Sequence, residues 1–287
     1  GLVLAARSGL QGKDMVLGML ANWAGNFSEQ PGRRWRSVED TGFDPVFAAR
    51  KAKPYASLAR SEDYYTEGAL VWLEIDQIIR RETAGKKSID DFARAFFGMR
   101  DGDWGQLTFE LKDVAATLNT VLPRDWEGFL NERFNQPGQP APVQGIEAGG
   151  YRLVWKEEPN PFDKARMTDA KILSLTYSLG TTIDKDGKVT AVQWDSPAFN
   201  AGIVTGAKIV AVGGTTYDAD GLKKAISSAK AGGGIDLLVQ RGDRFETVKV
   251  DYRGGLRWPW VERAAPGKAP TGLDRLLMPL RPVTKTK

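Results

Sequence analysis

The residue types in this chain exclude several common kinds of catalytic site. The 287 residues include no histidine and no cysteine. The chain therefore cannot form a Ser-His-Asp or Cys-His catalytic group, or the H-E-x-x-H zinc motif. Its 36 aspartates and glutamates could in principle bind calcium or magnesium, but there is no D-x-[DN]-x-[DN]-G calcium loop among them. We therefore expect no metal site and no bound cofactor in this chain.

Composition and charge limit the other functional classes. The chain is 41% hydrophobic and 26% charged, which is typical of a globular protein. No apolar run approaches the roughly 18 residues that a membrane span needs, and the first nine residues lack the basic leader of a signal peptide. Eight lysines and arginines but only two acids follow residue 252. Because the basic charge is concentrated there, we expect a loosely ordered tail and no nucleic-acid partner.

The elements that must position any site differ between the two halves of the chain. Apolar residues at spacings of three and four predict helices over residues 11–27 and 65–81. Ser88 and Asp91 resemble a capping box that opens a helix with Ile89, Phe92, Ala95 and Phe96 facing inward. Two more helices are expected over residues 110–121 and 125–134, the second capped by Asp125.

The second half of the chain is predicted to contain mainly β-strands. Residues 135–150 contain three prolines and four glycines, which is a linker composition. Strands are predicted over residues 151–155, 171–177, 180–184, 188–194, 207–214, 234–241 and 245–252. Only two helices interrupt them, over residues 197–201 and 219–229. Gly232, Gly233 and Gly234 lack the G-K-[ST] ending of a phosphate loop and precede a strand, so we interpret them as a turn.

Residues 166–252 resemble the PDZ family. The resemblance rests on the element order and on the DSPAFNAGIVTGAKIVAVGG run of residues 195–214. It implies a small β-barrel with two helices that binds a peptide C-terminus by strand addition. It also implies that the x-Φ-G-Φ loop formed by Ser178, Leu179, Gly180 and Thr181 holds the peptide carboxylate on backbone amides. Thr181 departs from the usual apolar residue, and the groove could instead be empty or filled by the tail.

The helical half resembles the glycyl aminopeptidase-like family of zinc metallopeptidases, in the gluzincin clan. The shared features are the P-G-R-R-x-x-S loop from Pro31, the Y-Y-x-x-G-A-L-V start of the helix from Tyr64, the R-R-x-[ST]-x-G-K-K-S-I-D-D run from Arg80, and the PDZ-like module that follows. The resemblance implies that this chain is the C-terminal half of such an enzyme. The zinc ligands would lie upstream, so we predict no hydrolysis by this chain alone.

The resemblance also implies a role for a tyrosine. In the wider clan, a Y-x-x-G tyrosine donates a hydrogen bond to the oxyanion of the tetrahedral intermediate. Tyr65 fills this position and Tyr64 is the second candidate. A phenol suits the role because it stays neutral at pH 7 and offers a directed O–H. Alternatively, Tyr65 packs at the helix start with its hydroxyl bonded to backbone. Arg33, Arg34 and Arg36 are interpreted as structural ion-pair partners.

These resemblances together predict a multidomain protein with helical and β-rich parts. Residues 1–134 would form the helical part of the peptidase catalytic domain, residues 135–165 a linker with a connecting strand, residues 166–252 the PDZ domain and residues 253–287 the basic tail. The expected partners are the upstream zinc-binding half, a peptide or protein substrate and a peptide C-terminus. The alternative function is a non-catalytic PDZ adaptor on a helical platform. A PDZ-bearing serine protease is disfavoured because no histidine could act as its base. We expect a bacterial periplasmic or secreted protein.

Overall fold

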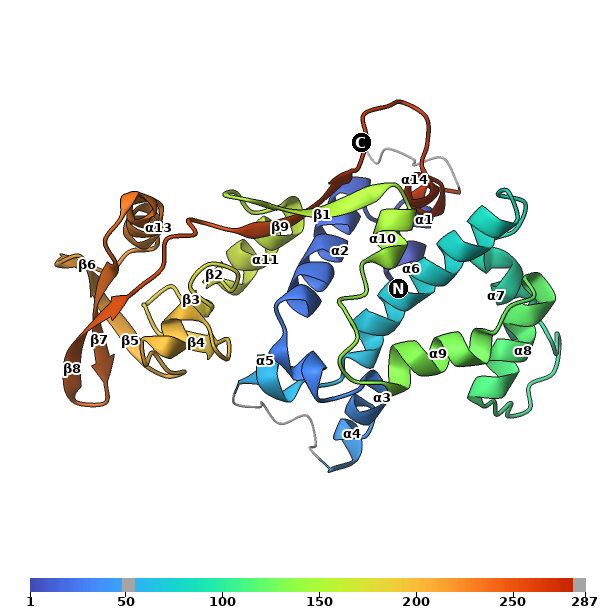
Figure 1. The fold of residues 1–287 in the computed structure, drawn as a ribbon, viewed down its shortest axis with the longest axis horizontal. Helices are drawn as coiled ribbons and strands as arrows, with labels where there is room; N and C mark the ends of the chain where they lie inside the picture. Colours follow the sequence, from blue (N-terminus) through green and yellow to red (C-terminus); the bar gives the residue numbers. More distant parts are fainter. Residues whose placement is uncertain (48–54, 281–287) are drawn as a thin grey trace.

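A helical part and a β-rich part make up the molecule (Figure 1). The structure is a computed structural model and describes residues 1–47 and 55–280. The helical part contains α1 (Leu2–Arg7), α2 (Lys13–Ser28), the short 3₁₀ helix η1 (Pro31–Arg34), α3 (Val38–Thr41), α4 (Asp44–Phe47), α5 (Ala56–Ala59), α6 (Tyr64–Glu82), α7 (Ile89–Phe97), α8 (Leu111–Val121), α9 (Trp126–Asn135) and α10 (Gln144–Ala148).

Helix α6 is the central element of the helical part. Its apolar residues all lie on buried faces, as the spacing predicted: Leu70, Leu73, Ile75, Ile78 and Ile79. One side of α6 packs in a core with α7, α8 and α9, and the other packs in a core with α1 and α2. The helix is thus held from both sides, which fixes the direction of its first turn.

The predicted helix starts are confirmed, with one error in the facing of α7. Ser88 and Asp91 form the capping box of α7, and the Asp125 side chain accepts a hydrogen bond from the Gly128 amide at the start of α9. Phe92 and Phe96 are buried, but Ala95 is exposed. The apolar face of α7 is only as wide as this i, i+4 pair, so Ala95 falls outside it.

The linker expected over residues 135–150 includes a packed helix. Helix α10 lies against α6, and Ile146 is completely buried. A Cβ at Gly145 would lie 2.4 Å from the amide nitrogen of Glu74, so only glycine lets the two helices approach this closely. Gly145 therefore serves close packing, and the glycine content of this segment does not mark an unpacked linker.

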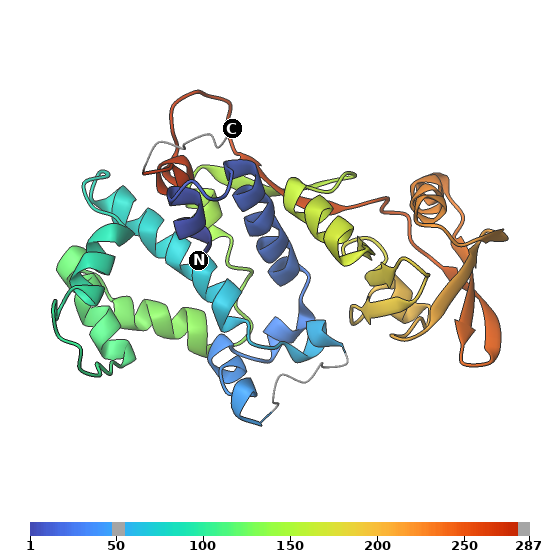
Figure 2. The same ribbon diagram turned by 180° about the vertical axis from the view of Figure 1, so that it is seen from behind.

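The expectation of a loosely ordered basic tail is wrong for most of its length. Strand β9 (Trp258–Arg263) pairs antiparallel with β1 (Tyr151–Lys156), which places Arg263 opposite Tyr151. Helix α14 (Gly272–Leu277) buries Leu273, Leu276 and Leu277 in the core formed with α1 and α2. Figure 2 shows this red segment returning from the β-rich part to the helical part. The apolar residues between the charges drive this packing. Arg281, Lys285 and Lys287 of the predicted tail lie outside the described residues.

The β-rich part holds two open sheets around one core. One has the order β2-β3-β4 and the other β6-β5-β7-β8. The elements are α11 (Pro161–Ala170), β2 (Ile172–Leu175), β3 (Thr181–Asp184), β4 (Val189–Val192), α12 (Pro197–Asn200), β5 (Lys208–Val212), β6 (Thr215–Thr216), α13 (Ala219–Ser228), η2 (Ala229–Ala231), β7 (Ile235–Arg241) and β8 (Arg244–Val250). The predicted strands and helices are therefore present, and the sequence analysis missed α11, β6 and β9.

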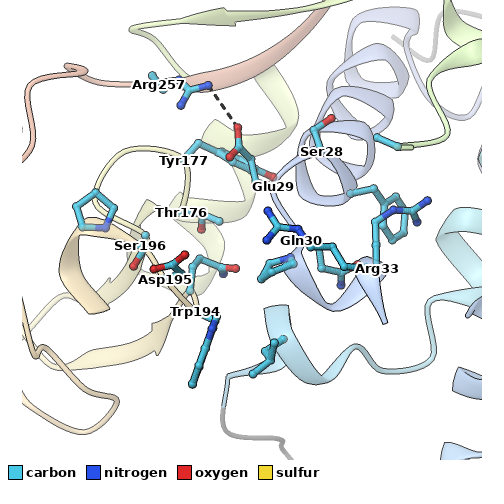
Figure 3. Close-up of a pocket in the computed structure, with 18 of the residues that line it drawn as sticks. Ser28, Glu29, Gln30, Arg33, Thr176, Tyr177, Trp194, Asp195, Ser196 and Arg257 are labelled. Atoms are coloured by element: carbon cyan, nitrogen blue, oxygen red, sulfur yellow. Dashed lines mark hydrogen bonds and ion pairs between the residues drawn. The ribbon is translucent and has the colours of Figure 1, made fainter. Parts of the chain in front are cut away.

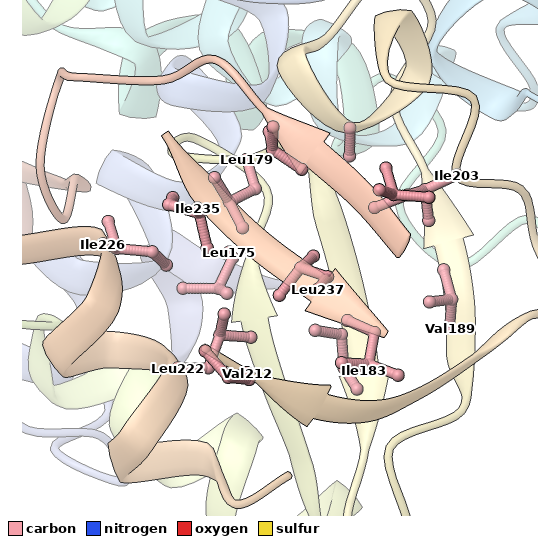
Figure 4. Packing of buried hydrophobic residues seen from close by; sticks show 14 of the residues in the cluster. Leu175, Leu179, Ile183, Val189, Ile203, Val212, Leu222, Ile226, Ile235 and Leu237 are labelled. Carbon is pink, nitrogen blue, oxygen red and sulfur yellow. The ribbon is translucent and has the colours of Figure 1, made fainter. Parts of the chain in front are cut away.

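The closed β-barrel that we expected is not formed by the described residues. Apart from a single bridge between Lys188 and Lys208, the two sheets are not joined by strand pairing. They instead face one another across a shared core. Figure 4 shows Leu175 of β2 near Leu222 and Ile226 of α13, on the same side of this core.

The described helices include none with both the length and the hydropathy of a membrane-crossing segment.

Candidate functional site

Tyr64 and Tyr65 lie in the first turn of α6. The exposed fraction of Tyr65 is 68%, whereas Tyr64 is partly buried. Their ring centroids are 4.5 Å apart. Among the residues that the structure describes, the Tyr65 hydroxyl has no hydrogen-bond partner. The geometry thus presents one phenol to the surface, without the backbone hydrogen bond that the alternative interpretation of Tyr65 requires.

A buried ionic network holds the helix turn that carries Tyr65. The carboxylate of Glu67 is 2% exposed and accepts hydrogen bonds from both Arg33 and Arg60. Arg60 also contacts Asp63, with 2.8 Å between Nε and Oδ2. The second Nη of Arg33 donates to the carbonyl of Pro140 at 2.8 Å. Hydrogen bonds to charged groups are the stronger kind, and here they join η1, the start of α6 and the segment before α10.

A second ionic group adjoins the first. Arg36 is buried and pairs with Asp40 and with Asp44, at 2.7 Å from Nη2 to Oδ1 of Asp44. Arg60 donates to the Arg36 carbonyl at 2.6 Å, which joins the two groups. The interpretation of Arg33 and Arg36 as structural ion-pair partners is therefore confirmed. Arg34 is different, because it is exposed and forms no ion pair within residues 1–47 and 55–280.

The x-Φ-G-Φ loop lies between β2 and β3, where the sequence placed it. Gly180 has φ +81°, and a Cβ there would lie 2.1 Å from the Cβ of Ser196, so glycine is needed both for the turn and for the close approach. Leu179 and Thr181 are buried, and the Thr181 hydroxyl has no hydrogen-bond partner among the described residues. The loop is thus a tightly packed turn.

Two amides of this loop are already bonded within the chain. The backbone N–H groups of Ser178 and Gly180 donate to the Leu175 carbonyl at 3.0 and 2.9 Å. Strand β3 pairs with β2 on one edge and with β4 on the other. Among the described residues, β3, the strand that follows this loop, therefore has no unpaired edge for peptide addition, and the segment that covers its first edge is β2 and not the C-terminal tail. The assignment of Ser178, Leu179, Gly180 and Thr181 to a peptide carboxylate stays a prediction.

A cleft of about 690 Å³ separates the helical part from the β-rich part (Figure 3). Ser178 and Gly180 line it, but Tyr65 does not, so the structure does not bring the two sets of predicted site residues together. Its wall on the helical side includes Glu29, Arg33, Arg34 and Trp35, and its wall on the β-rich side includes Tyr177, Trp194, Asp195 and Arg257. Sequence reasoning missed the aromatic and acidic members, because no motif connects residues so far apart in the chain.

Contacts across this cleft hold its walls together. Arg257 pairs with Glu29 at 3.4 Å, and its guanidinium lies over the Trp155 ring, 4.4 Å from the centroid. The Tyr177 hydroxyl donates to the Asn22 carbonyl at 3.1 Å. Burial raises the pKa of Tyr177 well above its usual value, and the nearby Asp163 carboxyl adds to the effect. Tyr177 is therefore a neutral hydrogen-bond donor at any physiological pH.

The acidic residues that the structure describes were compared with the ligand sets that metal ions need. Among residues 1–47 and 55–280 there is no group of three or more Asp or Glu side chains placed to hold a metal ion, and histidine and cysteine do not occur in the sequence. Zinc sites use histidine, cysteine and carboxylate ligands together. The residues present thus do not fit a zinc ion, and any zinc would need ligands from elsewhere.

The helical part matches a known protein family. Residues 1–71 match the model of the family described as M61 glycyl aminopeptidase. This match ends within α6 and includes both candidate tyrosines and the P-G-R-R loop. Curated relatives are the probable periplasmic serine endoproteases DegP-like of Brucella suis biovar 1 and Brucella abortus biovar 1, both 27% identical over 176 residues. The match covers 60% of this chain and 33% of each relative, so the chain spans about a third of the length of those relatives.

A solved structure resembles nearly the whole chain. It is the aminopeptidase N family protein of Idiomarina loihiensis, which superposes with a TM-score of 0.68 at 16% identity. The superposition covers 97% of this chain and 46% of that protein. At this identity the likeness concerns the fold alone. Together with the match over residues 1–71, it shows that the chain has an aminopeptidase-like fold.

Proposed function

We propose that this chain forms the helical wall of the substrate cleft, and a β-rich peptide-binding module, of a zinc-dependent aminopeptidase-like metallopeptidase. The zinc ligands would come from a segment that precedes residue 1 in the whole protein. The family match over residues 1–71 supports this proposal, as does the fold likeness to less than half of a longer aminopeptidase N family protein. The periplasmic name of the curated relatives supports a periplasmic location.

The observation that carries the proposal is the presentation of Tyr65. Its phenol is exposed at the first turn of a helix whose remaining faces are buried, and two buried arginines hold that turn through Glu67. In the proposed enzyme the Tyr65 O–H donates to the oxyanion that develops on the scissile carbonyl. A donor fixed before the reaction stabilises this charge without reorganisation. Substitution of one such donor lowers kcat by about 10²–10³-fold in other hydrolases.

Hydrolysis by the whole protein tests this role. The substrate is alanine p-nitroanilide, and the variants are Tyr65→Phe, Tyr64→Phe and the remote Tyr217→Phe. We expect Tyr65→Phe to lower kcat by about 10²-fold or more with little change in KM, while the other two stay near wild type. Loss in Tyr64→Phe but not in Tyr65→Phe would transfer the role to Tyr64. Full activity of both variants would refute it. The chain of residues 1–287 assayed alone should release no p-nitroaniline.

A second candidate function is a non-catalytic peptide-binding protein. The 176-residue match to DegP-like proteins favours it, because it covers more of this chain than the match to the aminopeptidase family. Those relatives are named as serine endoproteases, and this chain has no histidine to act as a base. Hydrolysis of alanine p-nitroanilide by the whole protein distinguishes the two functions, because an adaptor would bind peptides without hydrolysing this substrate.

A further inference from the structure

Two charged side chains that line the cleft between the two parts have no ion-pair partner among the described residues. Arg34 on the helical wall is exposed, and so is Asp195 on the β-rich wall. Within the described part of the chain, neither side chain forms an ion pair. Every other charged side chain named above as lining the cleft is paired: Glu29 with Arg257, and Arg33 with Glu67. Within residues 1–47 and 55–280, one unpaired cation and one unpaired anion therefore line the same cleft from opposite walls.

Exposed aromatic rings accompany these charges. Trp35 follows Arg34 and is 58% exposed, and Trp194 precedes Asp195 and is 37% exposed. Trp194 is held in place, because its amide donates to Ser57 Oγ at 2.8 Å and its ring lies 5.3 Å from that of Tyr55. Indole rings provide rigid apolar surface with little loss of entropy on binding. Both indole-bearing residues line the same cleft as the two charges.

The backbone at Asp195 is left-handed. This residue has φ +60°, in the left-handed region that few residues other than glycine, asparagine and aspartate adopt. Such conformations persist where the surrounding structure enforces them, and they concentrate at binding sites. Here the residues on both sides are held by hydrogen bonds: the Trp194 amide donates to Ser57 Oγ, and the Ser196 side chain caps α12. Asp195, which lines the cleft, thus lies between two residues that are held by hydrogen bonds.

We infer that this cleft binds a short peptide with free termini, with Arg34 pairing its carboxylate and Asp195 its ammonium. A simple anion would meet the carboxylates of Asp195 and Glu29, and an apolar ligand would leave two charges desolvated. A zwitterion satisfies both, and the indole rings contact its side chains. The volume of about 690 Å³ lies within the usual range of about 300–1,000 Å³ for ligand sites. This inference goes beyond the proposed function and does not use Tyr65.

The pairing of β3 with β2 favours the cleft over the β3 edge as the place where a peptide binds. Peptide addition at β3 would have to displace β2, whose residues Leu173 and Leu175 are buried in the core. The cleft needs no such displacement. Its walls are already joined by the Arg257–Glu29 pair and the Tyr177 hydrogen bond. A site that is formed before the ligand arrives avoids the cost of ordering.

Calorimetric titration of the chain with three tripeptides tests the inference. The probes are trialanine, its C-terminal amide and its N-acetyl form. We expect trialanine to bind in the millimolar range or tighter and each modified probe to bind about tenfold more weakly. Arg34→Ala should weaken trialanine by a similar factor and leave the amide unchanged. Asp195→Asn, which keeps a residue suited to the left-handed backbone, should weaken trialanine and leave the acetylated probe unchanged.

Matched controls and a folding check complete the test. Arg244→Ala and Asp243→Asn change exposed residues outside the cleft, and they should bind all three probes as wild type does. Thermal unfolding verifies that each variant is folded. The inference is overturned if trialanine gives no saturable heat at millimolar concentrations. It is also overturned if Arg34→Ala weakens the acid and the amide equally, or if the controls weaken as much as the cleft variants.

Discussion

The substitution Glu67→Gln should lower the free energy of unfolding of the helical part strongly, although it hardly changes the shape of the side chain. Glu67→Gln replaces one oxygen by an amide group and removes the charge shared by two guanidinium groups. Arg33 is 6% exposed and Arg60 2% exposed, so neither can recover hydration in place. Breaking a buried ion pair by removing one partner costs about 3–5 kcal/mol. That is a large part of the 5–15 kcal/mol by which a typical domain is stable.

Glu82→Gln provides the matched control, because Glu82 ends the same helix and also contacts two arginines. Its side chain is 34% exposed, and its contacts to Arg124 and Arg81 are 2.9 and 3.2 Å. Exposed pairs of this kind contribute about 0–1 kcal/mol. Urea denaturation followed by the helical circular dichroism signal measures both variants. The midpoint should fall markedly for Glu67→Gln and hardly for Glu82→Gln, with the slope unchanged in each.

Equal losses in the two variants, within about 1 kcal/mol, would refute the reasoning. They would mean that the Pro140 and Gln139 carbonyls already satisfy Arg33 and that Glu67 does not fix the start of α6. A cycle with Arg33→Met sharpens the result. If Arg33 and Glu67 depend on one another, the double variant should lose less than the sum of the single variants, with a coupling of about 0.5–3 kcal/mol.

Gly68→Ala should stabilise α6 by about 0.5–1 kcal/mol in thermal or urea unfolding, because a Cβ there meets no heavy atom within 4 Å; a destabilised variant would contradict the packing. Burial alone would raise the pKa of Asp274, but hydrogen bonds from Lys13, Thr271 and Tyr151 outweigh it and lower the pKa below its ordinary 3.8. Asp274 therefore adds stability above that pH that is lost in acid, and melting temperatures between about pH 5 and 3 should fall less in Asp274→Asn than in wild type. Gly180→Ala should cost more than about 2 kcal/mol and clearly more than Gly206→Ala, whose added Cβ meets no neighbouring atom; equal losses would show that Ser196 moves aside.

Local patterns in the sequence were sufficient to predict most elements. The i, i+3 and i, i+4 spacing of Leu70, Leu73 and Ile78 predicts α6, because burial of one helix face is a property of neighbouring residues. The capping boxes are equally local: Ser88 and Asp91 satisfy one another's backbone groups over a single turn. The Y-x-x-G segment likewise placed Tyr65 at a helix start, as the structure shows, although its catalytic role stays a proposal.

Features that depend on distant partners could not be predicted in this way. The run that gave β2 is a plausible strand, but nothing in its residues indicates that it pairs with the edge of β3 that a peptide would use. Strand β9 was hidden among basic residues, and it pairs with β1, which lies about a hundred residues earlier in the chain. Arg34 and Asp195 likewise lie far apart in the sequence and line one cleft only in the folded chain. Pairing between distant segments is decided by the whole fold, and single-sequence patterns carry no signal of it.

The joint between the two parts explains why the cleft can be a fixed site. The chain leaves the helical part through β1 and returns through β9, and these strands pair along six residues each. Helix α2 contacts both sides of this joint at Gly18 and Gly25, which are seven residues apart.

A Cβ at Gly25 would lie 2.8 Å from Pro259 of β9, and one at Gly18 would lie 2.6 Å from the side chain of Asn160, which caps α11. Rotation of the β-rich part would therefore break a strand ladder and open these contacts together. Interfaces packed this closely do not deform gradually. The walls that carry Arg34 and Asp195 therefore keep a set separation. The affinity of a ligand should depend steeply on the distance between its own two charges. Dialanine, trialanine and tetra-alanine should consequently differ in affinity for wild type, and the difference should vanish in Arg34→Ala, which removes one of the two fixed points.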